Sequence, residues 1–158
     1  LILYHTDLGR VLFLHGKLAM TIAASRFANC MYLALASGLD TDRGLSLARD
    51  LVNNPHMQER IDACANEIRL GASFDRALLS SHIFSQLYAS WISIGYKTGA
   101  MDDVMKRISE SYEEDTDEQL LHMISVLEPT LVIILCIFIG LILISLLLPL
   151  LGIMSSIG

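Results

Sequence analysis

The sequence predicts an all-α protein, a six-helix antiparallel bundle followed by one C-terminal transmembrane helix. Three observations support this fold class. Apolar residues recur at three- and four-residue intervals, and no stretch shows convincing two-residue alternation, so helices are favoured over strands. Glycines and an Asn-Pro pair, which are typical of helix ends, divide the chain at short intervals. Finally, residues 129–158 are 30 consecutive uncharged positions.

The first predicted helix covers residues 18–37. It is apolar almost throughout, apart from Arg26 and Asn29, and it stops at Gly38, which suits a helix C-terminus. Only eleven positions separate Arg26 from Gly38, too few to cross a bilayer, so we interpret this helix as a buried core helix. Residues 1–17 are expected to form a linker from a preceding transmembrane segment, with residues 1–4 as its tail.

The next three helices are short and have clear boundary signals. Asn54 supplies an N-cap and Pro55 the first helical position of the third helix, which ends before Gly71. Ser73 is placed to cap the fourth helix. The three predicted helices span residues 41–52, 55–70 and 74–79.

The fifth helix, residues 84–94, is predicted to be closed by the turn Gly95-Tyr96-Lys97-Thr98-Gly99. The sixth begins near residue 101 with two aspartates in its first turn, where carboxylates favour the positive end of the helix dipole. Its three-and-four apolar spacing continues to residue 127. Residues 18–128 are therefore expected to form one helical domain.

Pro129 lies where the sixth helix would otherwise continue into the apolar segment. Because proline has no N–H and disfavours helical geometry at the preceding residue, we expect a kink or a break there. Glu128 and Pro129 form a candidate hinge at the membrane boundary. In the simpler alternative, Glu128 stays hydrated at the headgroup level and only marks the edge.

The predicted transmembrane helix covers residues 129–151. Within it, residues 131–150 read LVIILCIFIGLILISLLLPL, and twenty residues at about 1.5 Å each span roughly 30 Å, the thickness of the bilayer hydrocarbon. A buried core helix is the less favoured alternative, because so small a domain could not enclose thirty uncharged residues. Residues 152–158 form a short tail.

The formal net charge of −6 is unevenly distributed. Residues 102–128 carry nine acidic and two basic side chains, a net of −7, whereas residues 1–101 have a net of +1. Nucleic-acid binding needs a basic face, and a polybasic lipid-binding segment needs clustered Lys or Arg. The sequence argues against both, and no nucleic-acid partner is expected.

Signatures of catalysis are missing from the sequence. Cys30, Cys64 and Cys136 show no CxxC spacing, and the five histidines form no HxxxH pair. There is no P-loop, GxGxxG or GxSxG motif. The sequence therefore predicts no catalytic residue, no cofactor and no metal site, and reduced thiols are expected.

The densest charge feature is a run of carboxylates in the sixth helix: Glu110, Glu113, Glu114, Asp115, Asp117 and Glu118. Paired catalytic carboxylates need burial to separate their pKa values, and such a run must be largely solvated. Three interpretations stay open: a solvated face, a docking surface for a basic partner, and a weak divalent-cation site.

Taken in order, eight short motifs resemble the F-type inner-membrane platform proteins of type II secretion and type IV pilus assembly. The resemblance covers residues 4–149 and fits the second cytoplasmic domain plus the last transmembrane helix of such a protein. One departure is that Tyr96 replaces the carboxylate of the usual Gly-Glu-x-Ser/Thr-Gly. The motifs are Arg26-Phe27, Leu35 to Leu39 (LASGL), Asn53-Asn54-Pro55, Gly71 to Phe74 (GASF), Thr98-Gly99 with Met101-Asp102, Tyr112 to Asp115 (YEED), Leu127-Glu128-Pro129 and Leu148-Pro149.

The resemblance implies a non-enzymatic platform that couples a cytoplasmic ATPase to the assembly of pilin-like or pseudopilin subunits. It also implies a bacterial inner-membrane location, with several spans in the full-length protein, the domain in the cytoplasm and the tail outside it. The implied partners are membrane lipid, the ATPase, the pilin-like subunits, other inner-membrane components and further copies of the chain.

Two alternatives belong to other functional classes. The first is a tail-anchored adaptor or receptor with a cytosolic helical interaction domain, which would have no upstream duplicate domain and no neighbouring ATPase gene. The second is a membrane-bound enzyme, which would need a cleft of polar groups that the sequence does not indicate.

Overall fold

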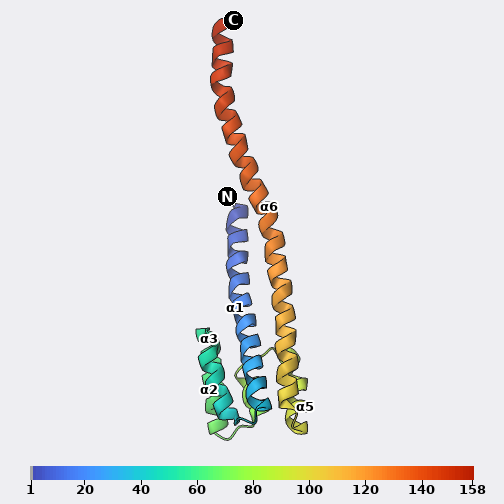
Figure 1. Ribbon diagram of the computed structural model, residues 1–158. Coiled ribbons are helices and arrows are strands. Elements are labelled where there is room, and N and C mark those ends of the chain that lie inside the picture. The colour runs from blue at the N-terminus through green and yellow to red at the C-terminus, as the bar shows by residue number, and fades with distance from the viewer. Residues whose placement is uncertain (1) are drawn as a thin grey trace. The chain divides into compact units, whose positions relative to one another are not determined.

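The computed structural model describes the backbone of residues 2–158 and the side chains of residues 15–125 and 127–158. Residues 2–158 form six α-helices and one short 3-10 helix without a strand, which confirms the all-α class (Figure 1). The chain divides into two compact units, one ending at Asp117 and one beginning at Glu118. The elements are α1 (Ile2–Ala36), α2 (Thr41–Leu51), α3 (Pro55–Arg69), α4 (Phe74–Ser80), η1 (Gln86–Tyr88), α5 (Ala89–Thr98) and α6 (Met101–Ile157).

The first unit has a single hydrophobic core to which every helix contributes. Complete burial of a Leu, Ile, Met or Phe side chain stabilises the folded state by about 1.5–3 kcal/mol relative to an exposed side chain. Within this unit, α1 and the first part of α6 lie side by side and run in opposite directions (Figure 1). Side chains at most 1% exposed are Phe27 and Met31 of α1, Leu45 of α2, Ile61 of α3, Leu78 of α4, Ile92 of α5, and Met105 and Ile108 of α6.

Two buried serines join α1 to α6. The Ser25 hydroxyl donates to the Ser109 carbonyl oxygen at 3.4 Å, and the Ser109 hydroxyl donates to the Ser25 carbonyl oxygen at 3.3 Å. A buried hydroxyl without a partner would cost about 1–3 kcal/mol, so this reciprocal pair satisfies both groups. The small residues let the two backbones come within hydrogen-bonding distance of each other's side chains.

The predicted helix boundaries at Asn54, Gly38 and Gly71 are confirmed. The Asn54 Oδ1 accepts from the Met57 backbone N–H at 3.1 Å, as an N-cap should. Gly38 and Gly71 have φ values of +76° and +97°, which favour glycine. At both ends the next residue's N–H reaches back to the helix, closing it with a Schellman motif.

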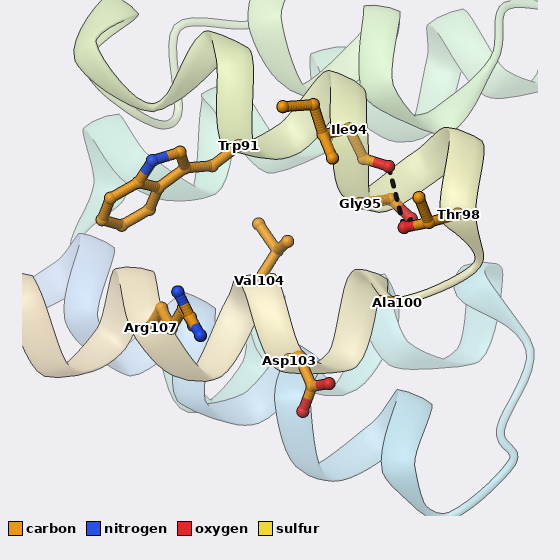
Figure 2. A pocket seen from close by; sticks show the side chains of 8 residues that line it. All are labelled: Trp91, Ile94, Gly95, Thr98, Ala100, Asp103, Val104 and Arg107. Atoms are coloured by element: carbon orange, nitrogen blue, oxygen red, sulfur yellow. Dashed lines mark hydrogen bonds between the residues drawn. The ribbon is translucent and has the colours of Figure 1, made fainter.

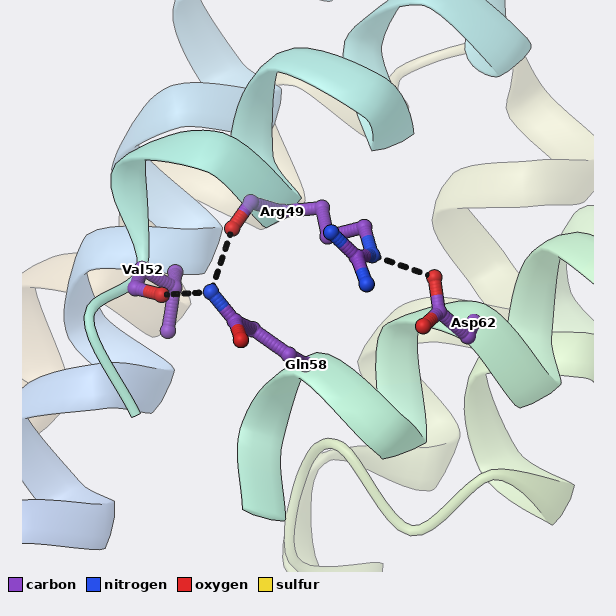
Figure 3. A network of polar contacts seen from close by, with 4 residues as sticks. All are labelled: Arg49, Val52, Gln58 and Asp62. Atoms are coloured by element: carbon purple, nitrogen blue, oxygen red, sulfur yellow. Dashed lines mark hydrogen bonds and ion pairs between the residues drawn. The ribbon is translucent and has the colours of Figure 1, made fainter. Parts of the chain in front are cut away.

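Helices α2 and α3 are joined by a polar network (Figure 3). The Gln58 amide donates to the carbonyl oxygens of Val52 at 2.9 Å and Arg49 at 3.3 Å, so it satisfies groups at the end of α2. The Arg49 Nε lies 2.6 Å from the Asp62 Oδ1. Both charged side chains are about half exposed, so this ion pair adds little stability and mainly fixes the register of the two helices.

Helix α1 is longer than the sequence predicted. It begins at Ile2, so residues 2–17, expected as a linker, are helical. Leu1 and the side chains of residues 1–14 lie outside the described part of the chain, so of residues 1–4, the predicted tail of a preceding span, only the backbone of residues 2–4 is described. The sequence predicted the start of the helix at residue 18, but the charged residues and glycines before it do not prevent a helix from extending.

Helix α6 also differs from the expectation of a break at Pro129. It runs through Pro129 and Pro149 and ends at Ile157, so most of the predicted tail is helical. A proline removes one backbone hydrogen bond, but the Leu- and Ile-rich flanks are good helix formers and keep the neighbouring bonds. The alternative of a break is therefore wrong, whereas the hinge at Glu128 and Pro129 stays a prediction.

Candidate interaction surface

Four acidic side chains of α6 form one exposed face, whereas Asp115 of the same run lies on another side of the helix. At about 100° per residue, Glu110, Glu113, Glu114 and Asp117 fall within about 100° of the helix circumference, opposite the side that carries the buried core residues. Glu118, the first residue of the second unit, is exposed too. Continuity and exposure are the geometric requirements of a docking surface.

One edge of this acidic face borders a basic side chain. Arg26 of α1 lines a groove of about 330 Å³ together with Glu113 and Asp117. Among the described side chains the structure contains one ion pair, Arg49–Asp62, so neither acid is paired with Arg26 within 4.0 Å. The carboxylates of this face are therefore exposed and form no ion pair among the described side chains.

Gly95 holds α5 close to α6 (Figure 2). It is buried, and a Cβ added there would overlap the Val104 Cγ2 methyl and lie 3.2 Å from the Val104 Cβ. The helices can therefore approach this closely only because residue 95 has no side chain. This contact is the physical reason for a glycine at the start of the motif Gly95 to Gly99.

The prediction of a turn over residues 95–99 is wrong. Gly95, Tyr96 and Thr98 belong to the last turn of α5, and the chain turns only at Gly99, whose φ is +72°. The Ala100 N–H bonds back to the Gly95 carbonyl at 2.9 Å. The Thr98 hydroxyl donates to the Ile94 carbonyl oxygen at 2.9 Å, also within the helix. Sequence reasoning interpreted the first glycine as a helix end, but the helix needs it for packing.

A second groove lies beside this motif, between α5 and α6. It has a volume of about 260 Å³ and includes Trp91, Ile94 and Arg107 in its lining (Figure 2). Trp91 is 42% exposed and Ile94 60%, and Leu87 of η1 is 82% exposed. These residues were not predicted as a site, since apolar residues spaced by three and four positions normally indicate a core-facing side. Tyr96 is exposed on α5.

The second unit is apolar and exposed. The side chains of residues 131–139 are all exposed, and Glu128 and Pro129 are exposed beside them. By length and composition, α6 is able to cross a membrane. Residues 15–36 of α1 meet the same requirements, but half of their most apolar stretch is buried inside the protein. Among the described residues, no group of three or more His, Cys, Asp or Glu side chains is placed to hold a metal ion.

Known proteins with similar sequences point to one family. Residues 27–149 match the profile of the family described as type II secretion system (T2SS), protein F. The type IV pilus assembly protein PilC of Thermus thermophilus is 27% identical over 144 residues, which cover 90% of this chain and 36% of that protein. Type II secretion system protein F of Pseudomonas aeruginosa is 26% identical over 143 residues, 90% of this chain and 35% of that protein. The chain thus spans about a third of the length of these relatives.

Proposed function

Because the chain belongs to the type II secretion system protein F family, we propose that it is a non-enzymatic inner-membrane platform of a type II secretion or type IV pilus assembly machine. Membership in this family confirms the resemblance to F-type platform proteins that motifs such as Leu127-Glu128-Pro129 indicated. The family match over residues 27–149 is the observation that carries the proposal.

The proposed platform has a cytoplasmic helical domain, residues 18–128, and a membrane span, residues 129–151, with a short tail outside the cytoplasm. Helix α6 serves both parts. Its first turns are held in the core by Met105 and Ile108, which are fully buried, whereas its later residues are apolar and exposed. In the full-length protein, further spans and further copies of the chain complete the platform together with lipid and other inner-membrane components.

In the proposed mechanism, a cytoplasmic ATPase acts on the helical domain, and the platform passes this work to pilin-like subunits being assembled. The acidic face formed by Glu110, Glu113, Glu114, Asp117 and Glu118 docks a basic surface of the ATPase. Complementary charges of this kind steer association and fix the register of two partners. The Glu128 and Pro129 junction then acts as the hinge between domain and span.

The docking step is tested by reversing Glu113, Glu114 and Asp117 to Lys. We expect unchanged helical content, because these side chains are exposed and unpaired, together with at least about tenfold weaker ATPase binding, the loss of roughly 1.4 kcal/mol. Binding of the parent should also weaken as salt rises, since exposed charges are screened within about 8–10 Å.

The matched control makes the same charge change elsewhere, with Asp40, Asp50 and Glu59 changed to Lys. These three side chains are exposed and lie away from α6. The control should bind the ATPase nearly as tightly as the parent. If the α6 variant binds like the control at low salt, the acidic face is only a solvated surface.

A further inference from the structure

A pocket on the first unit, distinct from the acidic face, gathers basic side chains. It has a volume of about 330 Å³, and its lining includes Lys17 of α1, Arg60 of α3 and His82 of the loop after α4. No Asp or Glu is found in its lining within the described residues, although the chain as a whole carries a net charge of −6. Basic side chains from three separate segments therefore line one cavity whose lining holds no carboxylate, although the charge of Asp115 acts on Tyr112 from outside the lining.

Arg60 is held in place but keeps most of its hydrogen-bonding capacity. Its Nη1 donates to the His82 carbonyl oxygen at 2.6 Å, and it forms no ion pair in the described part of the chain. A guanidinium has five N–H donors in a planar fork, so four stay available in a fixed orientation. His82 itself has a φ of +54°, an uncommon backbone conformation for a non-glycine residue.

Tyr112 adds a neutral donor from α6. Its hydroxyl oxygen accepts from the Ser85 backbone N–H at 3.1 Å, which leaves its own O–H free to donate. Burial raises the pKa of the Tyr112 hydroxyl, so the group stays protonated at neutral pH. Its ring packs on Phe84 with centroids 6.1 Å apart, which fixes the position of the donor.

The floor of the pocket is apolar. Met57 is fully buried, and Phe84 is 3% exposed. Basic side chains beside buried apolar ones in one pocket suit a ligand that has an anionic group and a carbon skeleton. Donors from α1, α3 and α6 that line one cavity suit a tetrahedral anion with several acceptor oxygens better than a planar carboxylate.

We propose that this pocket binds a phosphate ester, with Lys17, Arg60 and Tyr112 donating to the phosphate oxygens. The phosphate is supplied by a free phosphorylated molecule or by the headgroup of an anionic lipid. The site is separate from the acidic face and does not depend on the proposed docking of an ATPase.

Two probes distinguish the sources. The full chain, purified in a phosphate-free maltoside detergent, is titrated by calorimetry with inorganic phosphate at constant ionic strength. In parallel, its binding to phosphatidylcholine vesicles with and without phosphatidic acid is measured by flotation, and only the difference between the two compositions is compared, because the apolar segment inserts into either kind of vesicle. Lys17→Gln and Arg60→Gln should each weaken phosphate binding by about tenfold or more, because each removes a charge-assisted contact.

Arg43→Gln is the matched control, because Arg43 is exposed on α2 and does not line the pocket. If Arg60→Gln disturbs the fold, Lys17→Gln provides the test, since the Lys17 side chain forms no hydrogen bond within the described residues. Calorimetric binding that only the pocket variants weaken supports a free phosphate ligand. The same pattern confined to phosphatidic acid vesicles supports a lipid headgroup. If the parent binds neither probe, or if the pocket variants bind like Arg43→Gln, the proposal is overturned.

Discussion

At the scale of single residues, Gly95 determines how closely α5 approaches α6. The Val104 side chain occupies the space that a Cβ at position 95 would need. A packed interior resists added volume, because neighbouring side chains must leave their preferred rotamers or the backbone must shift. Gly95 is therefore required for packing, which differs from the role of Gly99 in turning the chain.

Gly95→Ala should lower the free energy of unfolding by about 1–3 kcal/mol, the usual cost of overpacking. Urea unfolding of the full chain in detergent, followed by circular dichroism, measures this change. Gly16→Ala is the control, because nothing lies within 4 Å of a Cβ at position 16 of α1. It should leave stability unchanged or raise it by up to about 1 kcal/mol. Equal effects of both substitutions would contradict the close contact.

Cys64 gives the stability a defined pH dependence. Burial raises the pKa of its thiol from 9.0 to about 12. Above pH 9 the unfolded chain loses this proton while the folded chain keeps it, so the unfolded state is favoured as the pH rises. The stabilisation is complete below pH 9 and is lost progressively as the pH approaches 12.

Cys64→Ala should remove this dependence. Between pH 9 and 11, the unfolding free energy of the parent should fall by up to about 1.4 kcal/mol per pH unit more steeply than that of the variant. Unfolding curves at several pH values measure the two slopes, and the titration of all other groups cancels in the difference. Parallel slopes would show that the thiol ionises equally in both states.

At the scale of elements, α6 is the helix on which the proposed mechanism depends. It contains Pro129 between the acidic face and the apolar segment, and the helix continues across it. The missing N–H leaves one carbonyl without its usual partner, which makes bending easier at this point than elsewhere. A continuous helix that lacks one backbone hydrogen bond at Pro129 is suited to transmit movement between the helical domain and the span by bending at that residue.

Pro129→Ala in the full-length protein should restore the backbone hydrogen bond and stiffen this junction. We expect normal membrane insertion but reduced secretion or pilus assembly, measured by complementation of a strain lacking the gene. Pro149→Ala changes the same residue type in the same helix, near the far end of the proposed span. It should retain activity. Full activity of Pro129→Ala would remove the hinge from the mechanism.

Local signals in the sequence predicted most helix boundaries, whereas the start of α1 and the two ends of α5 differ from the prediction and α6 continues through Pro129. Asn54, Gly38 and Gly71 act through bonds to their own helix, so their roles are visible in the sequence. The end of α5 was misplaced because the need for Gly95 arises from Val104, on another helix. The acidic face was predictable from residue spacing in one helix. The basic pocket was not, since Lys17, Arg60 and His82 come together only in the fold.

At the scale of the whole molecule, the chain separates its charged and apolar residues. The unit that ends at Asp117 has a buried core and every Lys and Arg of the chain. The unit that begins at Glu118 has exposed Leu and Ile side chains over most of its length. Such an exposed apolar surface is unfavourable in water and favourable in lipid. We therefore expect the apolar part of the second unit, residues 129–151, to lie in a membrane.

Cysteine labelling in membrane vesicles tests this expectation most directly. Cys136 lies within residues 131–150 and is exposed in the structure, so water would reach it if the segment were not in lipid. With Cys30 and Cys64 changed to Ala, Cys136 is the only thiol left. The control carries Cys136→Ala and Glu118→Cys, at an exposed position before the span.

The thiolate is the reactive species, and neither it nor a water-soluble maleimide enters hydrocarbon readily. The account predicts that Cys136 stays unlabelled until detergent is added, whereas position 118 reacts at once in vesicles with the cytoplasmic side outward. Labelling of Cys136 in intact vesicles at the rate seen for position 118 would contradict the membrane span, and with it the proposed platform.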